Sequence, residues 1–463
     1  MLGTTRGALA REERLSKVMA KASLSVELES KTYPPLAPAV STTDKLQQFS
    51  LYGDSSDFSI SVVNSSAILQ WDDRGRLTKL NHEISGCGTD YRRPEMAATR
   101  AVSEMLERQS GFLRSNLDIV RAARRELGDR AIPLARLPRC SQLEYADPRC
   151  GLSEPDEDDV LDWVMARSLS TGERKLVPVE MVLLGDRHGH ASKQLVAPIS
   201  TGYAAHVSAT DALLAGLLEV IERDAIALTW ECRLPLPRLD LGLLSEQARR
   251  LLDDDARRGI DNHLFDATTD IDGVSIVYCV QRDHANRRLR QSVHCAAALD
   301  PVTAADKVLR EAAVSRSAIM QAAKDTPIAT PEEISAVVDG AVYMGVAERE
   351  SAFEFLLADR PAPAPVPMPE RGFGESGRSD QLDSLVRRLT ERGHEVLAID
   401  LTTRSAAAHG IVVVRVIVLG LVPMSISPYA RYRGEPRMYE YPLHRFGMEI
   451  DEGGLNPWPQ PFA

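Results

Sequence analysis

The chain has 463 residues, of which 44% are hydrophobic and 26% are charged, and its formal net charge is −11. This length excludes a single small core, so we expect one large domain with subdomains or two to three domains. The acidic balance argues against a nucleic-acid partner, and no stretch of 18 apolar residues exists to span a membrane.

The first 55 residues have a mixed composition, and we expect a variable N-terminal extension ahead of a main domain at residues 56–463. No apolar h-region marks a signal peptide. Six cysteines are scattered without any CxxC pair, which is typical of reduced thiols rather than of a zinc site. These features predict a cytoplasmic protein.

Periodicity and turn residues predict an alternation of helices and strands, and so an α/β (α+β) fold. In chain order, we expect strands at 58–69 and 77–80, helices at 97–108 and 117–127, strands at 161–165 and 176–184, a helix from 208 to about 227, strands at 273–281 and 293–299, helices at 304–323 and 379–392, and strands at 396–402 and 411–419.

Two of these helices carry the same pattern. A turn at Gly86-Cys87-Gly88 is expected before the first helix, where Glu104 and Glu107 stand at i and i+3. Residues three apart on a helix share one face, so both carboxylates point the same way.

The second copy begins with a small-residue turn at residues 200–202. Ser208 is the expected N-cap of its helix, with Asp211 three residues on, a variant of the capping box. Glu219 and Glu222 then repeat the i, i+3 pair, 115 positions after the first copy. Four carboxylates on two helices suit Mg²⁺ ions bridged to substrate phosphates. The alternative is that each pair only forms a solvated helix face.

Two proline-rich segments stand out. Residues 361–370 are expected to form a stiff, extended loop. The GxGxxG sequence at 372–377 follows this loop and not a strand, so we read it as loop and not as a dinucleotide fold. The chain ends with a proline at every second position in residues 456–463, which predicts an extended rod, with a disordered end as the alternative.

The motifs of the two glutamate helices resemble the signature of the YcaO family, whose members are ATP-dependent enzymes that activate peptide backbone amides. The resemblance covers about residues 70–463. The resemblance implies mixed sheets flanked by helices, an ATP site between the two helices, and ATP and Mg²⁺ as cofactors. Azoline-forming members end in a similar proline-rich tail that reaches the active site. In this chain Gln460 replaces the tail's His, and Ala463 its last Pro.

The resemblance also implies roles for individual residues. Cys87 replaces the lysine of the family's first turn and Val314 replaces a glutamine. The expected sites are catalytic Pro459, Pro461 and Ala463; ATP-binding Ser208, Asp211, Arg223, Glu311 and Arg316; and Mg²⁺-binding Glu104, Glu107, Glu219 and Glu222.

The activity implied is the cyclodehydration of Cys, Ser or Thr in a ribosomal precursor peptide to thiazoline or oxazoline, in antibiotic-type peptide biosynthesis. Since no extra segment is long enough for a leader-binding domain, we expect a separate leader-binding partner protein, and a homodimer stays open. The alternatives are thioamide or macroamidine formation by the same family, or a catalytically silent scaffold.

Overall fold

The computed structural model describes residues 45–50, 59–71, 77–90, 93–112, 117–184, 193–358 and 377–462. The predicted proline-rich loop at 361–370 lies outside these ranges. The elements are β1 Lys45–Ser50, β2 Ser59–Trp71, β3 Leu77–Asp90, α2 Pro94–Ser110, β4 Ile119–Ala123, α3 Arg124–Leu127, α4 Gln142–Ala146, β5 Val160–Ser168, β6 Arg174–Pro178, β7 Tyr203–His206, α5 Ala209–Glu231, α6 Glu246–Arg257, β8 Ile260–Asp266, β9 Ser275–Asp283, β10 Gln291–Ala298, α7 Pro301–Asp325, α8 Val337–Met344, α9 Glu354–Leu357, α10 Arg378–Glu391, β11 Glu395–Asp400, α11 Arg404–Ala408, β12 Val412–Leu419 and α12 Arg437–Phe446.

The strands form three antiparallel sheets. The first has the order β1-β2-β3, the second β10-β9-β8, and the third β4-β5-β11-β12-β7 with β6 also paired to β5. Every named strand pair is antiparallel. Helices packed on antiparallel sheets confirm the predicted mixed fold, in its α+β form.

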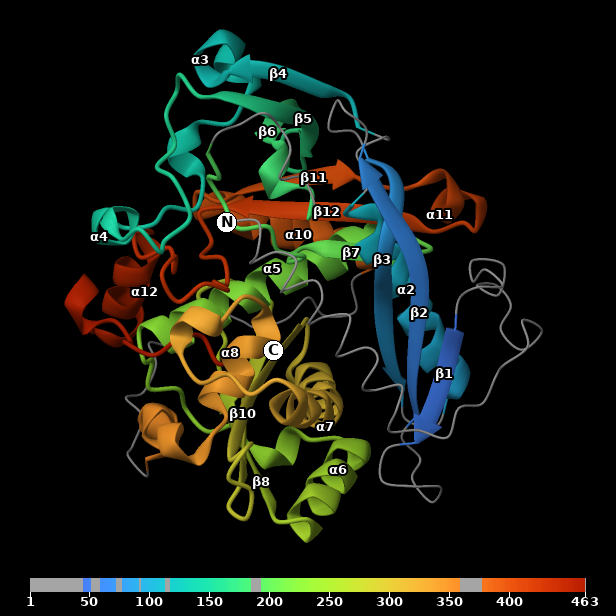
Figure 1. Ribbon diagram of the computed structural model, residues 1–463, viewed down its shortest axis with the longest axis vertical. Helices are drawn as coiled ribbons and strands as arrows, with labels where there is room; N and C mark the ends of the chain where they lie inside the picture. The colour runs from blue at the N-terminus through green and yellow to red at the C-terminus, as the bar shows by residue number, and fades with distance from the viewer. Residues whose placement is uncertain are drawn as a thin grey trace.

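Helix α5 runs through the middle of the molecule, between β12 and β7 on one side and β10 on the other (Figure 1). Its N-terminal half has one buried stripe, whereas every residue from Asp224 to Glu231 is buried. A helix that is buried all round must be covered on every side. This central position explains why β10 reaches Glu222, through Ala297, and α12 reaches the neighbouring Asp224, through Arg437.

The turn predicted at Gly86-Cys87-Gly88 is wrong: these residues belong to the end of β3, which pairs with β2. The glycines serve close packing instead. A Cβ on Gly86 would lie 1.9 Å from the carbonyl oxygen of Ala101, and one on Gly88 would lie 1.9 Å from that of Ala97. Strand β3 can therefore lie directly on the backbone of α2, because neither glycine has a side chain.

The helix predicted at 117–127 is also wrong, because Ile119–Ala123 is the strand β4, paired with β5, and only the single turn α3 follows. The strand predicted at 176–184 ends at Pro178, after which residues 179–181 form a 3-10 turn. Sheet pairing overrides local helix propensity in the first case. Elements α6, β8 and α12 were not predicted.

No helix in the described ranges is long and apolar enough to cross a membrane.

The buried strand predicted at 411–419 is confirmed as β12, and Arg415 within it is 8% exposed. The Arg415 guanidinium donates to the carbonyl oxygens of Met181, Ile199 and Thr201. This arginine thus fixes the segment that leads into α5.

Candidate functional site

The start of α5 is built as the sequence predicts. Ser208 Oγ accepts a hydrogen bond from the backbone nitrogen of Asp211 at 3.3 Å, which caps the helix. The Asp211 carboxylate lies 3.8 Å from His206 Nδ1 and 3.5 Å from Arg378 Nε. A half-exposed polar patch therefore forms at this helix N-terminus, where the helix dipole favours negative groups.

The first glutamates of the two copies are held in the same way. Glu104 Oε2 accepts from the backbone nitrogen of Cys87 at 2.7 Å, and Glu219 Oε2 accepts from that of Gly202 at 2.9 Å. Each glutamate also pairs with the arginine four residues on, at 2.7 Å for Arg108 and at 3.2 Å for the second copy. In both copies the donor lies 17 residues upstream, so the duplication extends to the geometry.

The second glutamate of α5 is locked among donors. Glu222 is 3% exposed, and its Oε2 accepts from the backbone nitrogen of Ala297 at 2.9 Å and from Lys307 Nζ at 3.0 Å. Its Oε1 lies 3.3 Å from Arg223 Nη1. Burial lowers the pKa of Lys307, but Glu222 and Glu311 outweigh it and raise that pKa above its ordinary value. The ammonium group therefore remains charged.

Glu107, the second glutamate of α2, lies among like charges. Desolvation, Glu219 and Glu104 together raise the pKa of Glu107 well above its usual range. The influence of Glu219 places carboxylates of α2 and α5 close enough to repel each other. Like charges at close range disfavour ionisation unless a cation joins them.

Two predicted nucleotide contacts lie on α7. Lys307 Nζ is 3.9 Å from Glu311 Oε1, so Glu311 shares a cation with Glu222. Arg316 is 7% exposed, and its guanidinium donates to the carbonyl oxygen of Leu289 at 2.8 Å and to Asp283 Oδ2 at 3.1 Å. The structure therefore gives Arg316 a bridging role between α7 and the β9–β10 hairpin, and its contact with nucleotide stays a prediction.

The proline-rich tail is packed against α5. Pro459, Pro461 and Phe462 are buried, and the carbonyl oxygen of Trp458 accepts from Trp230 Nε1 at 3.0 Å. The Arg223 guanidinium lies 5.5 Å from the centroid of the Phe462 ring.

This arginine pairs with both glutamates of α5. The tail therefore runs to the edge of the glutamate cluster (Glu104, Glu107, Glu219 and Glu222). Ala463 lies outside the described residues.

The sequence reasoning missed Lys307, Arg415 and Asp224. Lys307 stands one helical turn before Glu311, and that i, i+4 spacing was a usable signal. Asp224 follows the glutamate motif directly. It is fully buried, and its carboxylate accepts from the backbone nitrogen of Val422 at 2.9 Å and from Arg437 at 2.9 Å. Asp224 thus anchors α5 and does not face the glutamates.

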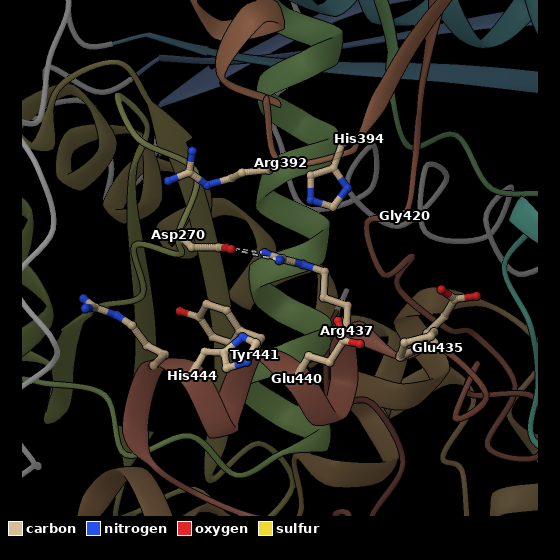
Figure 2. A pocket seen from close by; sticks show the side chains of 11 residues that line it. Asp270, Arg392, His394, Gly420, Glu435, Arg437, Glu440, Tyr441 and His444 are labelled. Atoms are coloured by element: carbon tan, nitrogen blue, oxygen red, sulfur yellow. Dashed lines mark hydrogen bonds and ion pairs between the residues drawn. The ribbon is translucent and has the colours of Figure 1, made fainter. Parts of the chain in front are cut away.

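A pocket of about 450 Å³ lies beside this anchor (Figure 2). Its central side chain, Arg437, points toward Asp270 in Figure 2 and binds it at 2.6 Å as well as Asp224. Arg392 on its rim pairs with Asp272 at 2.8 Å. The arginines named here are held in structural ion pairs, and the glutamate cluster lies elsewhere on α5.

The donor set of the glutamate cluster fits a hard divalent cation. It offers carboxylate oxygens, the ligands that Mg²⁺ prefers, and burial together with the neighbouring carboxylates raises the pKa of Glu107, a shift that a bound cation would oppose. Within the described ranges, no three acidic, histidine or cysteine side chains already converge as a ready metal cluster. The fit is therefore one of chemistry and charge, and no coordination geometry follows from it.

Similar folds are found among solved structures. A heterocyclase in complex with substrate and cofactor matches with a TM-score of 0.71 at 22% identity, over 97% of this chain and 57% of that one. The YcaO protein from Methanopyrus kandleri, bound with AMPPCP and Mg²⁺, matches with a TM-score of 0.55 at 18% identity, over 90% and 91% of the two chains. The E. coli microcin synthetase McbBCD complex contains a chain that matches with a TM-score of 0.53 at 13% identity, over 86% and 90%.

These likenesses show the fold, and the chain spans little more than half of that heterocyclase. In sequence, an uncharacterized protein of Methanothermobacter thermautotrophicus is 29% identical over 275 residues, which cover 58% of this chain and 67% of the relative. Residues 86–422 match the family described as "YcaO cyclodehydratase, ATP-ad Mg2+-binding". That description confirms ATP and Mg²⁺ as the expected cofactors, and the match spans both glutamate helices and most of the chain: this protein belongs to the YcaO family.

Proposed function

We propose that this protein is an ATP-dependent cyclodehydratase that converts Cys, Ser or Thr residues of a ribosomal precursor peptide to azolines. Family membership supports an ATP-dependent enzyme. The observation that carries azoline chemistry is the tail: Phe462 packs over Arg223, the residue that pairs with both glutamates of α5.

In the proposed reaction, the side-chain sulfur or oxygen of the substrate residue loses its proton and attacks the carbon of the preceding amide, which closes the five-membered ring. The former carbonyl oxygen then takes the γ-phosphoryl group of ATP. Phosphate leaves with that oxygen, the amide nitrogen gives up its proton, and the C–N bond of the ring becomes C=N. One ATP is converted to ADP and phosphate for each ring.

Several residues of this chain would hold the cosubstrates. Glu104, Glu107, Glu219 and Glu222 would hold Mg²⁺, which neutralises the phosphates of ATP when bound. Lys307 and Arg223 would supply fixed positive charge beside the carboxylates, at 3.0 Å and 3.3 Å from Glu222. Phosphoryl transfer requires mainly positioning and charge neutralisation, so no nucleophile from the protein is needed.

The polar patch at the start of α5, with Ser208 and Asp211, would bind the nucleotide at its own end of the helix, two turns before Glu219. On this proposal the tail brings the carboxylate of Ala463 to the substrate. A terminal carboxylate, with an ordinary pKa near 3.5, is ionised at neutral pH and could accept the amide proton.

A partner protein that binds the leader of the precursor peptide also belongs to the proposal. A microcin synthetase complex is among the similar folds, which supports a peptide substrate and a multiprotein setting. Thioamide or macroamidine formation is the second candidate, and the silent scaffold is the third. The buried, packed tail favours azoline formation over both.

The test combines purified protein, a candidate precursor peptide and its leader-binding partner with ATP and Mg²⁺. We expect phosphate release together with the loss of one water mass per ring in the peptide. Incorporation of sulfur or a macrocyclic amidine would assign the chain to the second candidate. ATP binding without any change in the peptide, across matched peptides and partners, would favour the scaffold.

A further inference from the structure

The tail crosses helix α8 at one residue, Gly340. A Cβ built on Gly340 would lie 2.2 Å from the carbonyl oxygen of Gln460 and 3.9 Å from that of Phe462. Two carbonyl groups of the tail therefore lie over the same glycine. In Figure 1, α8 lies close to the C-terminus, and it contacts α7 and β10.

The contact at Gly340 leaves no room for a side chain. Real Cβ atoms do not approach a backbone oxygen as closely as 2.2 Å, so any side chain at this position would push the tail outward. Yielding of α8 itself is opposed by its N-terminus, where the Asp339 carboxylate accepts from the backbone nitrogens of Ser335 and Ala336, both at 2.9 Å. The tail is the element that would move.

The tail would transmit such a shift to its end. It is anchored upstream by two hydrogen bonds. The carbonyl oxygen of Trp458 accepts from Trp230 Nε1 at 3.0 Å, and the carbonyl oxygen of Asn456 accepts from Arg431 Nη1 at 2.8 Å. Beyond the anchor, Pro459 and Pro461 restrict the backbone on both sides of Gln460. A displacement at Gln460 therefore reaches Phe462 and the residue after it, and does not fade within a flexible segment.

The side chain of Gln460 does not hold the tail in place by hydrogen bonds. It is 7% exposed, and within the described part of the chain neither its Oε1 nor its Nε2 has a partner. Gln460 is therefore held by the packing around it, which includes the close approach of its carbonyl oxygen to Gly340.

We infer that Gly340 is a positioning residue that sets the depth of the C-terminal tail beside Arg223, and through it the rate of ring formation. The inference rests on the proposed function for its link to catalysis. It depends on the contacts of α8 alone for its link to the position of the tail.

The experiment compares four chains: wild type, Gly340→Ala, a truncation lacking residues 459–463, and the two changes combined. Cyclodehydration of the precursor peptide is measured with the partner protein present. Access to the tail is measured separately, by carboxypeptidase digestion followed by mass spectrometry. The matched control is Gly453→Ala, where a Cβ would lie at an ordinary 3.5 Å from Asp451 Oδ1.

We expect Gly340→Ala to slow ring formation about 10²-fold or more, toward the truncated chain, because it withdraws the proposed general base. Its terminal residues should be released faster than in wild type, while ATP affinity is kept. Gly340 is helical and Ala is the better helix former, so a melting temperature at or above wild type would show that the helix is intact. In the truncated chain the same substitution should change nothing, since its partner is gone.

Wild-type rates and wild-type protection of the tail in Gly340→Ala would overturn the inference. A further loss in the truncated background would also overturn it, because the effect would then not pass through the tail. If no chain forms azolines but Gly340→Ala exposes the tail, the role of Gly340 in positioning the tail is supported and the proposed function fails.

Discussion

The two glutamate helices share a motif and a way of holding its first carboxylate, but they differ at the second. On α5, Glu222 is enclosed by Ala297, Lys307 and Arg223. On α2, burial and the neighbouring carboxylates Glu219 and Glu104 raise the pKa of Glu107. The second glutamate of α5 is therefore bonded to cations of the protein, whereas the second glutamate of α2 is the carboxylate that an added cation would stabilise most. Repetition in sequence does not guarantee repetition of charge balance.

The largest effects should separate the two halves. Glu107→Gln and Glu222→Gln should each lower ATP turnover by about 10²–10³-fold, because both remove a carboxylate from the cluster. Glu222→Gln should also lower the free energy of unfolding by about 2 kcal/mol, since it weakens bonds to charged partners in a buried site. Glu107→Gln should leave stability unchanged or higher, because it removes a buried carboxyl group whose ionised form is disfavoured. Steady-state phosphate release and thermal melting measure the two quantities, and normal turnover in either variant would remove that glutamate from the site.

The glycine before α5 is constrained in two ways, by close packing, as Gly86 and Gly88 also are, and by a positive φ. Gly202 has φ +85, and a Cβ on it would lie 2.2 Å from the carbonyl oxygen of Val416. Gly202→Ala should cost about 2 kcal/mol of folding free energy and reduce turnover, because it shifts the nitrogen that binds Glu219. Chemical denaturation measures the loss, and a variant as stable as wild type would contradict the assigned backbone geometry.

The strand that supports Glu222 should weaken in acid. His294 on β10 is buried, and burial, with Arg316 nearby, lowers its pKa to about 3 from an ordinary 6.5. Between these values the unfolded chain binds a proton that the folded chain does not. The free energy of unfolding should therefore rise with pH from about 3 to 6.5 and level off above, by about 1–2 kcal/mol between pH 5 and 6.5.

Denaturation at several pH values in wild type and His294→Gln isolates this contribution. The difference between the two chains should grow toward acid, with the wild type losing more. Parallel plots of the free energy of unfolding against pH in the two chains would show that His294 does not cause the loss of stability in acid.

The smallest effect is expected at Cys87. Its backbone nitrogen, not its thiol, holds Glu104, at 2.7 Å. Cys87→Ala should therefore change ATP turnover by less than about twofold and stability by less than about 1 kcal/mol. A large loss would mean that the side chain has a role of its own in the first copy.

The glutamate pairs, the Ser208 cap and the course of α5 could be predicted from the sequence, because helix periodicity and capping are local signals. Strand β4 could not be predicted, since Ile119–Ala123 becomes a strand only through pairing with β5, some 40 residues on. The glycines of β3 were mistaken for a turn. They are needed because β3 packs directly on the backbone of α2, a contact that no local sequence pattern encodes.

The partners of the site were harder to predict than its acids. A lysine such as Lys307 looks like any surface lysine until α7 folds back onto Glu222. Likewise the sequence shows that the tail is stiff, but only the fold shows that it passes over Gly340.

The central claim is that ATP hydrolysis at the glutamate cluster drives ring formation in a peptide. The most direct measurement follows phosphate release and peptide mass in one reaction, for wild type and Glu219→Gln with precursor peptide and partner protein. The account predicts one phosphate released for each water lost in wild type, and neither in Glu219→Gln, which folds normally. Rings formed without phosphate release, or equal phosphate release by the variant, would contradict it.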